Sequence, residues 1–410
     1  MIMFTGTNLW SLGAKKGASS FYQTLRHYAE NGYQVELVSC SRTEGLDIPG
    51  VSARHVNLDW LARMGQVRKI GFAFRLLVWF VFQIYVIAVG LRLTRLKQPV
   101  FLYAYEIAGV PATLLLGKLV GLPVVSRFQG TIMKPLMATP GWRFRYWDHW
   151  LALRARTELV IMANDGTEGD EVLKRLGAPD TAVRFWMNGV DINPVHCSDE
   201  DRASIRHSVG CGPDNLILLT VSRLVAWKRL DRIISAMPEI KRSVPEAKLV
   251  IVGDGDARPE YERLVQELGI GECVFFTGAA LQADVAKYIS VADVFVSLYD
   301  LSNVGNPLLE AMSLGKSVIT LNNGGTGSMV SNDVNGVLLE PEALATLPEA
   351  VVKLLRDQAR RACLGTAAKE HAQRTFWTWS QRMKQEILEV EQLCSGWNYR
   401  EAEKSIGELH

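Results

Sequence analysis

Short apolar runs, each followed by a helix-like segment, are the feature that most constrains the fold of this chain. Buried strands of a parallel sheet read as such runs, and crossover helices must connect them. The first series lies near residues 1–5, 35–39, 100–105, 123–127, 159–163 and 183–187, and the second comprises LILLTVS, KLVIVGDG, CVFFTG, DVFVSL, SVITL and GVLLE. The alternation predicts an α/β fold with two Rossmann-like parallel sheets.

A polar, turn-rich stretch, NPVHCSDEDRASIRHSVGCGPDN, separates the two series and has the composition of a linker. A chain of 410 residues is also long for a single hydrophobic core. We therefore expect an N-terminal domain over 1–195 and a second domain over 196–375. A C-terminal helix and tail over 376–410 is expected to dock back across the domains.

Composition and charge narrow the class of protein. The chain is 48% apolar and 21% charged, which is typical of a globular protein, and its formal charge of +2 does not favour nucleic acid as a partner. The six cysteines are scattered without zinc-site spacing, so we expect no metal and reduced thiols in the cytoplasm. The first residues, MIMFTGTNLWSLG, lack the basic and apolar regions of a secretion signal.

One strongly apolar segment, IGFAFRLLVWFVFQIYVIAVGLRL at 70–93, bears on localisation. Its uninterrupted part, 76–91, would form a helix about 24 Å long, shorter than the ~30 Å hydrocarbon core of a bilayer. The strand-like runs on either side of it are expected in one sheet, which excludes a spanning helix. We predict a buried helix first and a helix at the membrane surface as the alternative. The run GWRFRYWDHWLALRAR is typical of a membrane interface, or of an amphipathic helix with core aromatic residues.

The stretch YDLSNVGNPLLEAMSLGKSVIT reads as loop, helix and strand, with one carboxylate, Glu310, in an otherwise apolar helix. We expect Asn306 to cap this helix, Pro307 to begin it and Gly315 to end it. Free N–H groups at such a helix start form a natural anion site, which Gly305 would let a phosphate approach closely. Glu310 could then accept hydrogen bonds from sugar hydroxyls, or it could simply complement the helix dipole.

Two cations follow the first strand of the second series, within LTVSRLVAWKRLDRIISAM. Arg223 comes directly after the strand, and Lys228 lies five residues later, ahead of an amphipathic helix. Arg can hold a diphosphate as a fork and Lys as a point charge, so the pair suits a diphosphate ligand. Taken alone, however, such cations are more often an ordinary feature before a helix.

The order of these motifs resembles the family-4 retaining glycosyltransferases of the GT-B fold, in which two Rossmann-like domains face a cleft. The C-terminal part of the resemblance comprises the two cations, VIVGDG, FTG, VADVFVSL and GNPLLEAMSLGKSVI in this order. In the N-terminal half, GAKKGASSFYQTLRHYAENGYQVELVS looks like the family's glycine loop and first helix, and RFWMNGVD looks like its asparagine-glycine-valine turn. The resemblance covers nearly the whole chain. It implies sugar transfer from a nucleotide-activated donor with retention of configuration, usually without a required metal.

The resemblance also assigns roles to individual residues. Arg223 and Lys228 would neutralise the donor diphosphate as the nucleotide departs, and Glu310 would bind the donor's ribose hydroxyls. The remaining donor-side residues would be Ser302, Asn303, Val304, Gly305, Asn306 and Gly253. The acceptor or cleft side would comprise Lys16, Gly17, Glu106, Gln129, Gly130 and Asn188.

Two positions depart from the family pattern. Ser302 stands where the first acid of the Glu-x7-Glu motif belongs, and Asn303 is the nearest side chain able to replace that acid's hydrogen bonds to the transferred sugar. Gln129 stands where the family often has His, and Gln cannot act as an acid or base near neutral pH. In the retaining mechanism usually proposed for the family, the leaving phosphate itself accepts the acceptor's proton, so no residue is needed at position 129.

The predicted function is hexosyl transfer from a nucleotide-diphosphate sugar to a carbohydrate or lipid-linked acceptor. The enzyme would be cytoplasmic, either soluble or peripheral at the inner membrane face. A nucleotide-sugar 2-epimerase of similar fold remains an alternative, although Gln129 and Ser302 do not supply the acids and histidines it needs. A non-catalytic nucleotide-binding subunit is the other alternative. Asp254-Gly255-Asp256 spells a metal-binding DxD pattern, but we predict a tight turn there.

Overall fold

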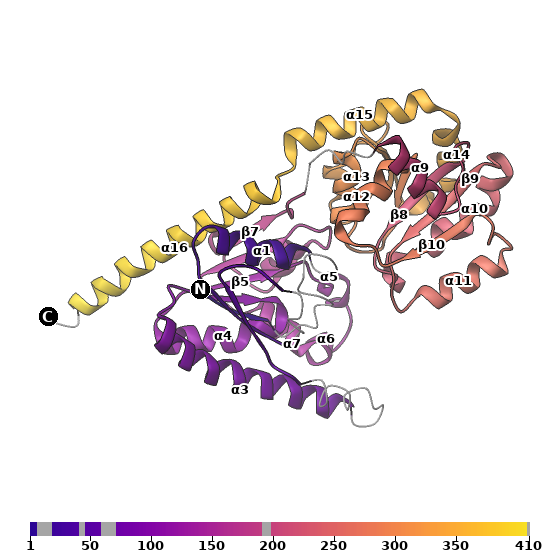
Figure 1. Cartoon of the computed structure of the whole chain (residues 1–410). Helices are drawn as coiled ribbons and strands as arrows, with labels where there is room; N and C mark the ends of the chain where they lie inside the picture. The colour runs from indigo at the N-terminus through magenta and orange to yellow at the C-terminus, as the bar shows by residue number, and fades with distance from the viewer. Residues whose placement is uncertain (6–18, 41–45, 59–70, 191–197, 408–410) are drawn as a thin grey trace. The chain divides into compact units, whose positions relative to one another are not determined.

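The computed structural model describes residues 1–5, 19–40, 46–58, 71–190 and 198–407, and the chain divides into two compact units (Figure 1). The N-terminal unit comprises Met1–Asn164, Gly169–Met187 and Trp379–His410, and the C-terminal unit comprises Asp165–Glu168 and Asn188–Thr378. The last helix therefore returns to the N-terminal unit. The short segment Asp165–Glu168 lies within the N-terminal part of the sequence but belongs to the C-terminal unit.

The N-terminal unit is built on a parallel seven-stranded sheet with the order β3-β2-β1-β4-β5-β6-β7. Its strands are β1 (Ile2–Thr5), β2 (Val35–Ser39), β3 (Val51–His55), β4 (Leu102–Tyr105), β5 (Val124–Phe128), β6 (Leu159–Ala163) and β7 (Val183–Trp186). The predicted strands are confirmed, but β3 was not predicted. It is an edge strand with largely exposed side chains, so its sequence lacks the apolar signal of its neighbours.

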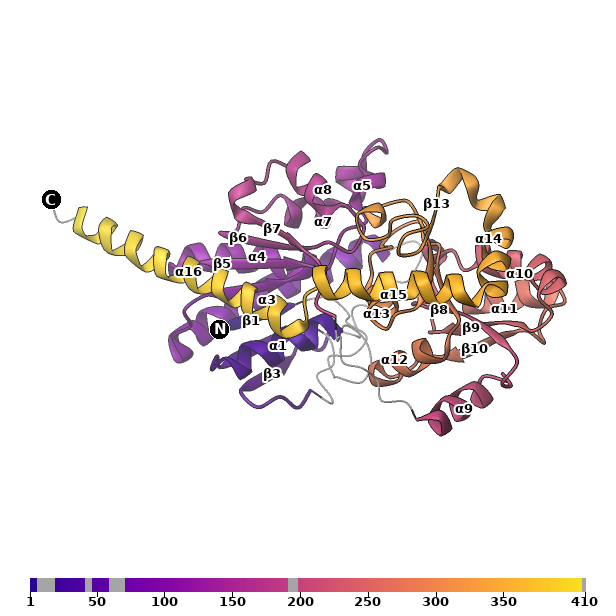
Figure 2. The same cartoon turned by 90° about the horizontal axis from the view of Figure 1, so that it is seen from above.

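Helices cover both faces of this sheet. One face carries α1 (Ser19–Glu30) and α16 (Trp379–Gly407), which share a core with residues such as Met3, Tyr103 and Ile161. The other face carries α3 (Gly71–Lys97), α4 (Glu106–Val120), α7 (Trp147–Leu153) and α8 (Gly169–Arg175), and Figure 2 shows α16 running along the side of α1. The short helices α5 (Met133–Leu136) and α6 (Trp142–Arg145) precede α7.

The polar residue Gln83 of the apolar helix α3 hydrogen-bonds to backbone groups of the neighbouring helix α4 beside a proline. Pro111 lies inside α4 and disturbs the local helical hydrogen bonds, because its ring crowds the carbonyl of the preceding turn. Gln83 Nε2 donates to the Ala108 carbonyl at 2.9 Å, and its Oε1 accepts from the Ala112 N–H at 2.8 Å. The Gln83 amide therefore bridges the donor and acceptor that straddle the proline and fixes α3 against α4.

The helix α3 is long and apolar enough to cross a membrane by length and composition, with a mean hydropathy of 2.1 over its candidate span. Only 28% of that span is buried. The strands β2 and β4, which precede and follow α3 in sequence, lie in the same sheet. The first prediction, a buried core helix, is therefore wrong for most of α3. Its core side, including Phe82, Val86 and Leu93, packs on the sheet, and its other side is exposed.

A buried ionic cluster fixes α16 to the N-terminal unit. Glu386 Oε2 lies 3.1 Å from Arg127 Nη1 and 3.0 Å from Arg382 Nη1, and all three side chains are at most 1% exposed. The hydroxyl of Tyr103 donates to Glu386 Oε1 at 2.7 Å. Burial alone would raise the pKa of Glu386, but the two guanidinium groups and the hydrogen bonds hold it below its usual range.

The C-terminal unit has a parallel six-stranded sheet with the order β10-β9-β8-β11-β12-β13. Its strands are β8 (Leu216–Val221), β9 (Ala247–Val252), β10 (Val274–Gly278), β11 (Val294–Ser297), β12 (Ser317–Leu321) and β13 (Val337–Leu339). Its helices are α9 (Asp199–Ser208), α10 (Asp231–Ser243), α11 (Arg258–Glu267), α12 (Gln282–Val291), α13 (Asn306–Ser313), α14 (Leu347–Arg356) and α15 (Gln358–Thr375). All six strands were expected from the sequence, and the two-sheet α/β fold is confirmed.

Candidate active site

The predicted donor residues of the C-terminal unit converge because of the strand order. In this sheet β8 lies between β9 and β11, so the chain crosses over at this point. Ligands of open α/β sheets bind outside the carboxyl ends of the strands at such a point. Arg223 follows β8, Gly253 follows β9 and the loop at Ser302 follows β11, which brings three separate parts of the sequence to one sheet edge.

Lys228 is the buried cation of this site. It ends the short helix η2 (Ala226–Lys228), and its Nζ donates to the carbonyl of Ser302 at 3.1 Å. The same ammonium lies 3.9 Å from the ring centroid of Tyr299 and 4.5 Å from that of Trp227. Burial lowers the pKa of Lys228 to about 7, although the carboxylate of Asp165 opposes this effect. An anionic ligand would therefore meet a cation held by rings and a carbonyl.

Arg223 supplies the second cation at this sheet edge. Its guanidinium lies 5.9 Å from the Trp227 ring, which also contacts Lys228. Arg223 is exposed, whereas Lys228 is buried. The two predicted cations are thus brought to the same aromatic residue, and they offer a guanidinium fork beside a buried point charge.

The loop before α13 differs in detail from the prediction. Gly305, in an extended conformation, is the N-cap, and the helix begins at Asn306 instead of Pro307. The side chain of Asn306 donates to the Gly189 carbonyl at 3.4 Å, so the prediction of Asn306 as the cap was wrong. No side chain of the described residues caps α13, which leaves the start of this helix suited to an anionic ligand. The predicted stop at Gly315 is confirmed by its φ of +72°.

Asn303, the predicted replacement for the missing acid, is hydrogen-bonded within its own loop. Asn303 is buried, its Oδ1 accepts from the Tyr299 N–H at 3.0 Å, and its Nδ2 donates to the Tyr299 carbonyl at 2.7 Å. Asn303 Nδ2 also contacts Asn323 Oδ1. The amide therefore shapes the loop, and its role in sugar binding stays a prediction. The backbone of Ser302 has φ +59°, which is uncommon for a residue other than glycine.

Glu310 and Gly253 complete the predicted donor side. Glu310 is buried one turn into α13, so its position beside the anion site agrees with the resemblance, although its ribose contact stays a prediction. Gly253 has φ +141°, and a Cβ there would lie 1.8 Å from the Ser222 carbonyl oxygen. Only glycine fits where these two strand ends meet. Asp256 and Ala257 lie in a turn before α11, as predicted, and Arg258 Nη1 lies 3.6 Å from Asp254 Oδ2.

On the predicted acceptor side, the N-terminal unit brings Glu106 and Gln129 together. Glu106 begins α4 with φ +63°, and its Oε1 accepts from the Gln129 N–H at 2.7 Å. Gly130 follows with φ +114°, so these residues form a cluster at the ends of β4 and β5. Lys16 and Gly17 lie outside the described residues. Asn188 belongs to the C-terminal unit.

Three residues at the donor site were not predicted: Asp165, Trp227 and Tyr299. The two aromatic residues contact Lys228, and Asp165 is the acid whose charge acts on it. Asp165 is the second residue after a predicted strand, and a polar residue just beyond a strand end could have identified it. Trp227 precedes Lys228 in sequence, but nothing in the sequence distinguishes it from an ordinary apolar residue.

Comparisons with known proteins agree with this geometry. Residues 201–371 match the family Glycosyl transferases group 1. The fold is shared with HepE from Anabaena, solved with UDP and glucose, at TM-score 0.73 and 20% identity over 96% of this chain and 99% of that one. Sucrose-phosphate synthase from Thermosynechococcus elongatus gives TM-score 0.75 and 20% identity over 97% and 100%. The predicted resemblance to glycosyltransferases of the GT-B fold is thereby confirmed.

Curated relatives are similar over part of the chain. A GDP-mannose-dependent α-(1-6)-phosphatidylinositol monomannoside mannosyltransferase from Mycolicibacterium smegmatis is 30% identical over 211 residues, which are 50% of this chain and 55% of the relative. The sulfoquinovosyl transferase SQD2 from Arabidopsis thaliana is 26% identical over 279 residues, 64% of this chain and 51% of the relative. The chain spans about half the length of the curated relatives it matches.

Proposed function

We propose that the chain is a retaining glycosyltransferase that moves a hexose from a nucleotide-diphosphate sugar to an acceptor hydroxyl. The observation that carries the proposal is Lys228, buried beside Trp227 and Tyr299 at the crossover point of a group 1 glycosyltransferase domain. As the donor bond breaks, negative charge develops on the departing diphosphate. Lys228 and Arg223 would stabilise that charge without a metal, and the leaving phosphate would accept the acceptor's proton.

The titration of Lys228 predicts how donor binding depends on pH. Burial depresses its pKa to about 7, so the folded protein without ligand loses this charge as the pH rises above 7. A diphosphate favours the charged form, and binding above pH 7 must therefore include uptake of a proton. We expect nucleoside-diphosphate affinity to be constant below pH 7 and to fall by up to tenfold per pH unit above it. Titrations of the wild type between pH 6 and 9 test this. The control is Lys228→Met, which lacks the titrating group and should bind weakly at every pH. A flat profile for the wild type would contradict it.

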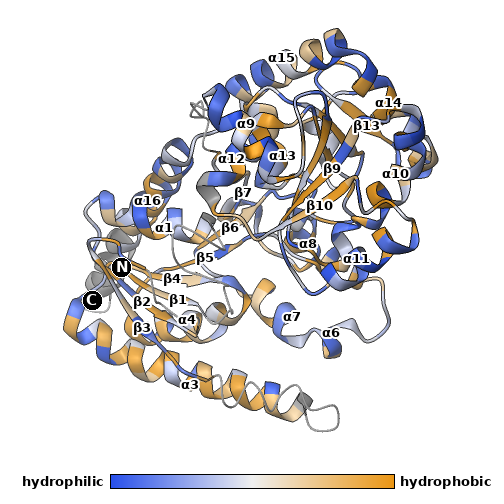
Figure 3. Ribbon diagram, turned by 45° about the vertical axis from the view of Figure 1, so that its right-hand side comes forward, coloured by the Kyte–Doolittle hydropathy of each residue, from blue (hydrophilic) through white to orange (hydrophobic). Residues whose placement is uncertain are grey.

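The exposed side of α3 supports a membrane-bound acceptor. We define a membrane face by exposed apolar residues that share one side of α3, which are Ala73, Leu77, Phe80, Ile84 and Ala88, together with Leu115 and Leu119 of α4. In Figure 3 most of α3 has the colour of hydrophobic residues. No acidic residue occurs anywhere in α3, and Arg92, Arg95 and Lys97 are exposed near its end.

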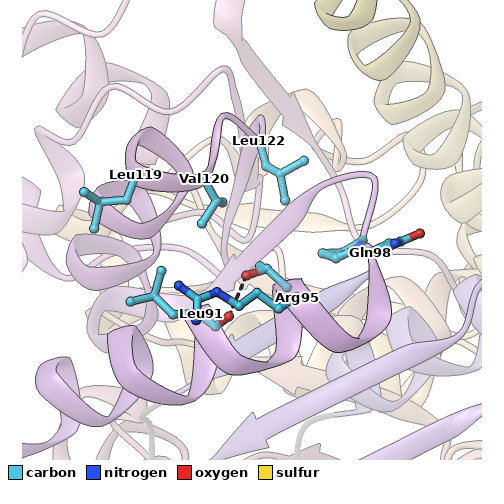
Figure 4. Close-up of a pocket in the computed structure, with 8 residues that line it drawn as sticks. Leu91, Arg95, Gln98, Leu119, Val120 and Leu122 are labelled. Carbon is cyan, nitrogen blue, oxygen red and sulfur yellow. Dashed lines mark hydrogen bonds between the residues drawn. The ribbon is translucent and has the colours of Figure 1, made fainter.

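A hollow of about 450 Å³ adjoins this face, where the ends of α3 and α4 meet (Figure 4). Its walls include Leu91 and Arg95 from α3 and Leu119 and Val120 from α4. Apolar walls beside a cation suit the border between acyl chains and phosphate groups. We propose that the N-terminal unit lies peripherally on the cytoplasmic surface of an anionic membrane and takes a lipid-linked acceptor there.

Charge on the membrane face should abolish this association. Phe80 and Ile84 are 49% and 65% exposed, so the double variant Phe80→Glu/Ile84→Glu should fold and yet lose at least tenfold in vesicle binding. Co-sedimentation with vesicles of phosphatidylglycerol and phosphatidylethanolamine measures this. Val334→Glu, at a site 62% exposed in the C-terminal unit, is the matched control and should bind like the wild type. Equal binding by all three proteins would refute the membrane proposal.

Product analysis tests the proposed reaction. The purified chain would be incubated with GDP-mannose or UDP-glucose and a bacterial lipid extract, and the product examined by ¹H NMR. We expect an α-linked glycolipid from the α-configured donor. A β-linked product would refute retention, and conversion of the nucleotide-sugar without any acceptor would favour the epimerase instead. Unchanged turnover in EDTA is the corresponding expectation for a reaction that needs no metal.

A further inference from the structure

The segment Asp165–Glu168 packs on the loop that carries the donor site. The Val304 N–H donates to the carbonyl of Asp165 at 3.0 Å. Gly166 has φ +89°, and a Cβ there would lie 2.9 Å from the Val304 nitrogen and 3.0 Å from the Asn303 nitrogen. Glycine is therefore needed at 166 for this close approach, and the approach places the preceding residue, Asp165, directly beside position 302.

The carboxylate of Asp165 is held in one orientation. Its Oδ1 accepts from the Thr167 N–H at 3.1 Å and from the Thr167 hydroxyl at 2.6 Å. The side chain of Ser302 also hydrogen-bonds to Asp165, and the charge of Lys228 acts on it. An ionised carboxylate can accept about four hydrogen bonds, so the three donors named here, two from Thr167 and one from Ser302, leave capacity for a ligand hydroxyl.

Two other polar side chains of this loop, those of Asn303 and Asp300, already have hydrogen-bond or ion-pair partners. Asn303 is bonded to the backbone of Tyr299. Asp300, the nearest acid in the loop's own sequence, pairs with Arg229 at 3.2 Å and with Arg232 at 2.6 Å. The carboxylate that the fold brings to Ser302 therefore comes from a different part of the chain.

We propose that Asp165 is the residue that binds the transferred sugar, accepting a hydrogen bond from one of its hydroxyls in place of the acid that Ser302 lacks. This inference rests on the proposed function, since it needs a nucleotide-sugar in the site. It assigns to Asp165 a contact with the sugar and none with the nucleotide. A carboxylate accepts from a hydroxyl more strongly than a neutral group does, so it can select the orientation of the sugar.

The test compares ligands that differ only in the sugar. Wild type, Asp165→Asn and Glu168→Gln would be titrated with GDP and GDP-mannose, and with UDP and UDP-glucose. The Asn variant keeps the shape of the side chain and removes its charge, and Glu168→Gln makes the same charge change three residues later. The titrations are made at pH 6, so that Lys228 stays charged when Asp165 no longer supports its charge. We expect Asp165→Asn to keep the wild-type affinity for the nucleoside diphosphate within about twofold and to lose about tenfold for the nucleotide-sugar. Glu168→Gln should change neither.

Equal weakening of both ligands in Asp165→Asn would show that Asp165 only holds the loop, and unchanged binding of both would show no role; either result overturns the inference. If the wild type binds none of these four compounds and neither ADP nor its sugar conjugates, the proposed function itself fails. The double variant Asp165→Asn/Ser302→Glu supplies a second measurement, since an acid restored at 302 should recover the lost selectivity for the nucleotide-sugar. No recovery there would also count against the inference.

Discussion

Replacement of Lys228 by alanine is expected to lower kcat/KM for sugar transfer by about 10²–10³ without unfolding the protein. The buried ammonium is one of two cations at the donor site, and its removal leaves Arg223 and the start of α13 to stabilise the departing diphosphate. The fold should tolerate the change, because Lys228 is buried among rings and its depressed pKa already reflects an unfavourable environment for charge. Steady-state kinetics with a nucleotide-sugar measure the loss, and circular dichroism reports the fold.

The matched control for this variant is Lys241→Ala. Lys241 lies on α10 of the same unit and makes a partly exposed ion pair with Glu272 at 3.7 Å. Such pairs contribute little, so this variant should retain wild-type kinetics. Equal activity of Lys228→Ala and the wild type would refute the donor site described here.

The variant Glu386→Ala is expected to destabilise the N-terminal unit by about 3–5 kcal/mol, because it leaves two buried guanidinium groups, those of Arg127 and Arg382, without their shared counterion. Urea unfolding of the full chain, followed with a probe in each unit, measures this loss. The transition of the C-terminal unit should not shift, since Glu386 belongs to the other unit.

Glu389→Ala is the control on the same helix. Glu389 pairs with Arg184 at 2.7 Å, but both side chains are partly exposed, at 18% and 30%. We therefore expect a loss of at most about 1 kcal/mol. If the two variants unfold at the same urea concentration, the buried cluster does not fix α16 as described.

Most of the fold could be predicted because parallel strands are buried on both faces and therefore appear as apolar runs. The edge strand β3 escaped because Ser52 to Arg54 are exposed and give no such run. The helix α3 was misplaced for the opposite reason. Its sequence is apolar all round, so composition could not distinguish a core helix from one with an exposed apolar side.

The donor site was predictable where neighbouring residues in sequence form it. Arg223 and Lys228 follow one strand, and the loop at 302–306 precedes one helix. The role of Asn306 was wrong because a cap depends on the backbone at Gly305, which sequence preference does not determine. Asp165 was missed because it is far from Ser302 in sequence and contacts the loop through hydrogen bonds that no local pattern records.

Thermal unfolding of wild type and Lys228→Ala with GDP, UDP, ADP and CMP, and with their sugar conjugates, shows whether Lys228 forms part of a nucleotide-sugar site. A ligand at one hundred times its dissociation constant should stabilise the wild type by roughly 2.7 kcal/mol. We predict a shift for one nucleotide series in the wild type and its loss in Lys228→Ala. A shift that persists in the variant, or none with any nucleotide, would contradict a nucleotide-sugar site at Lys228.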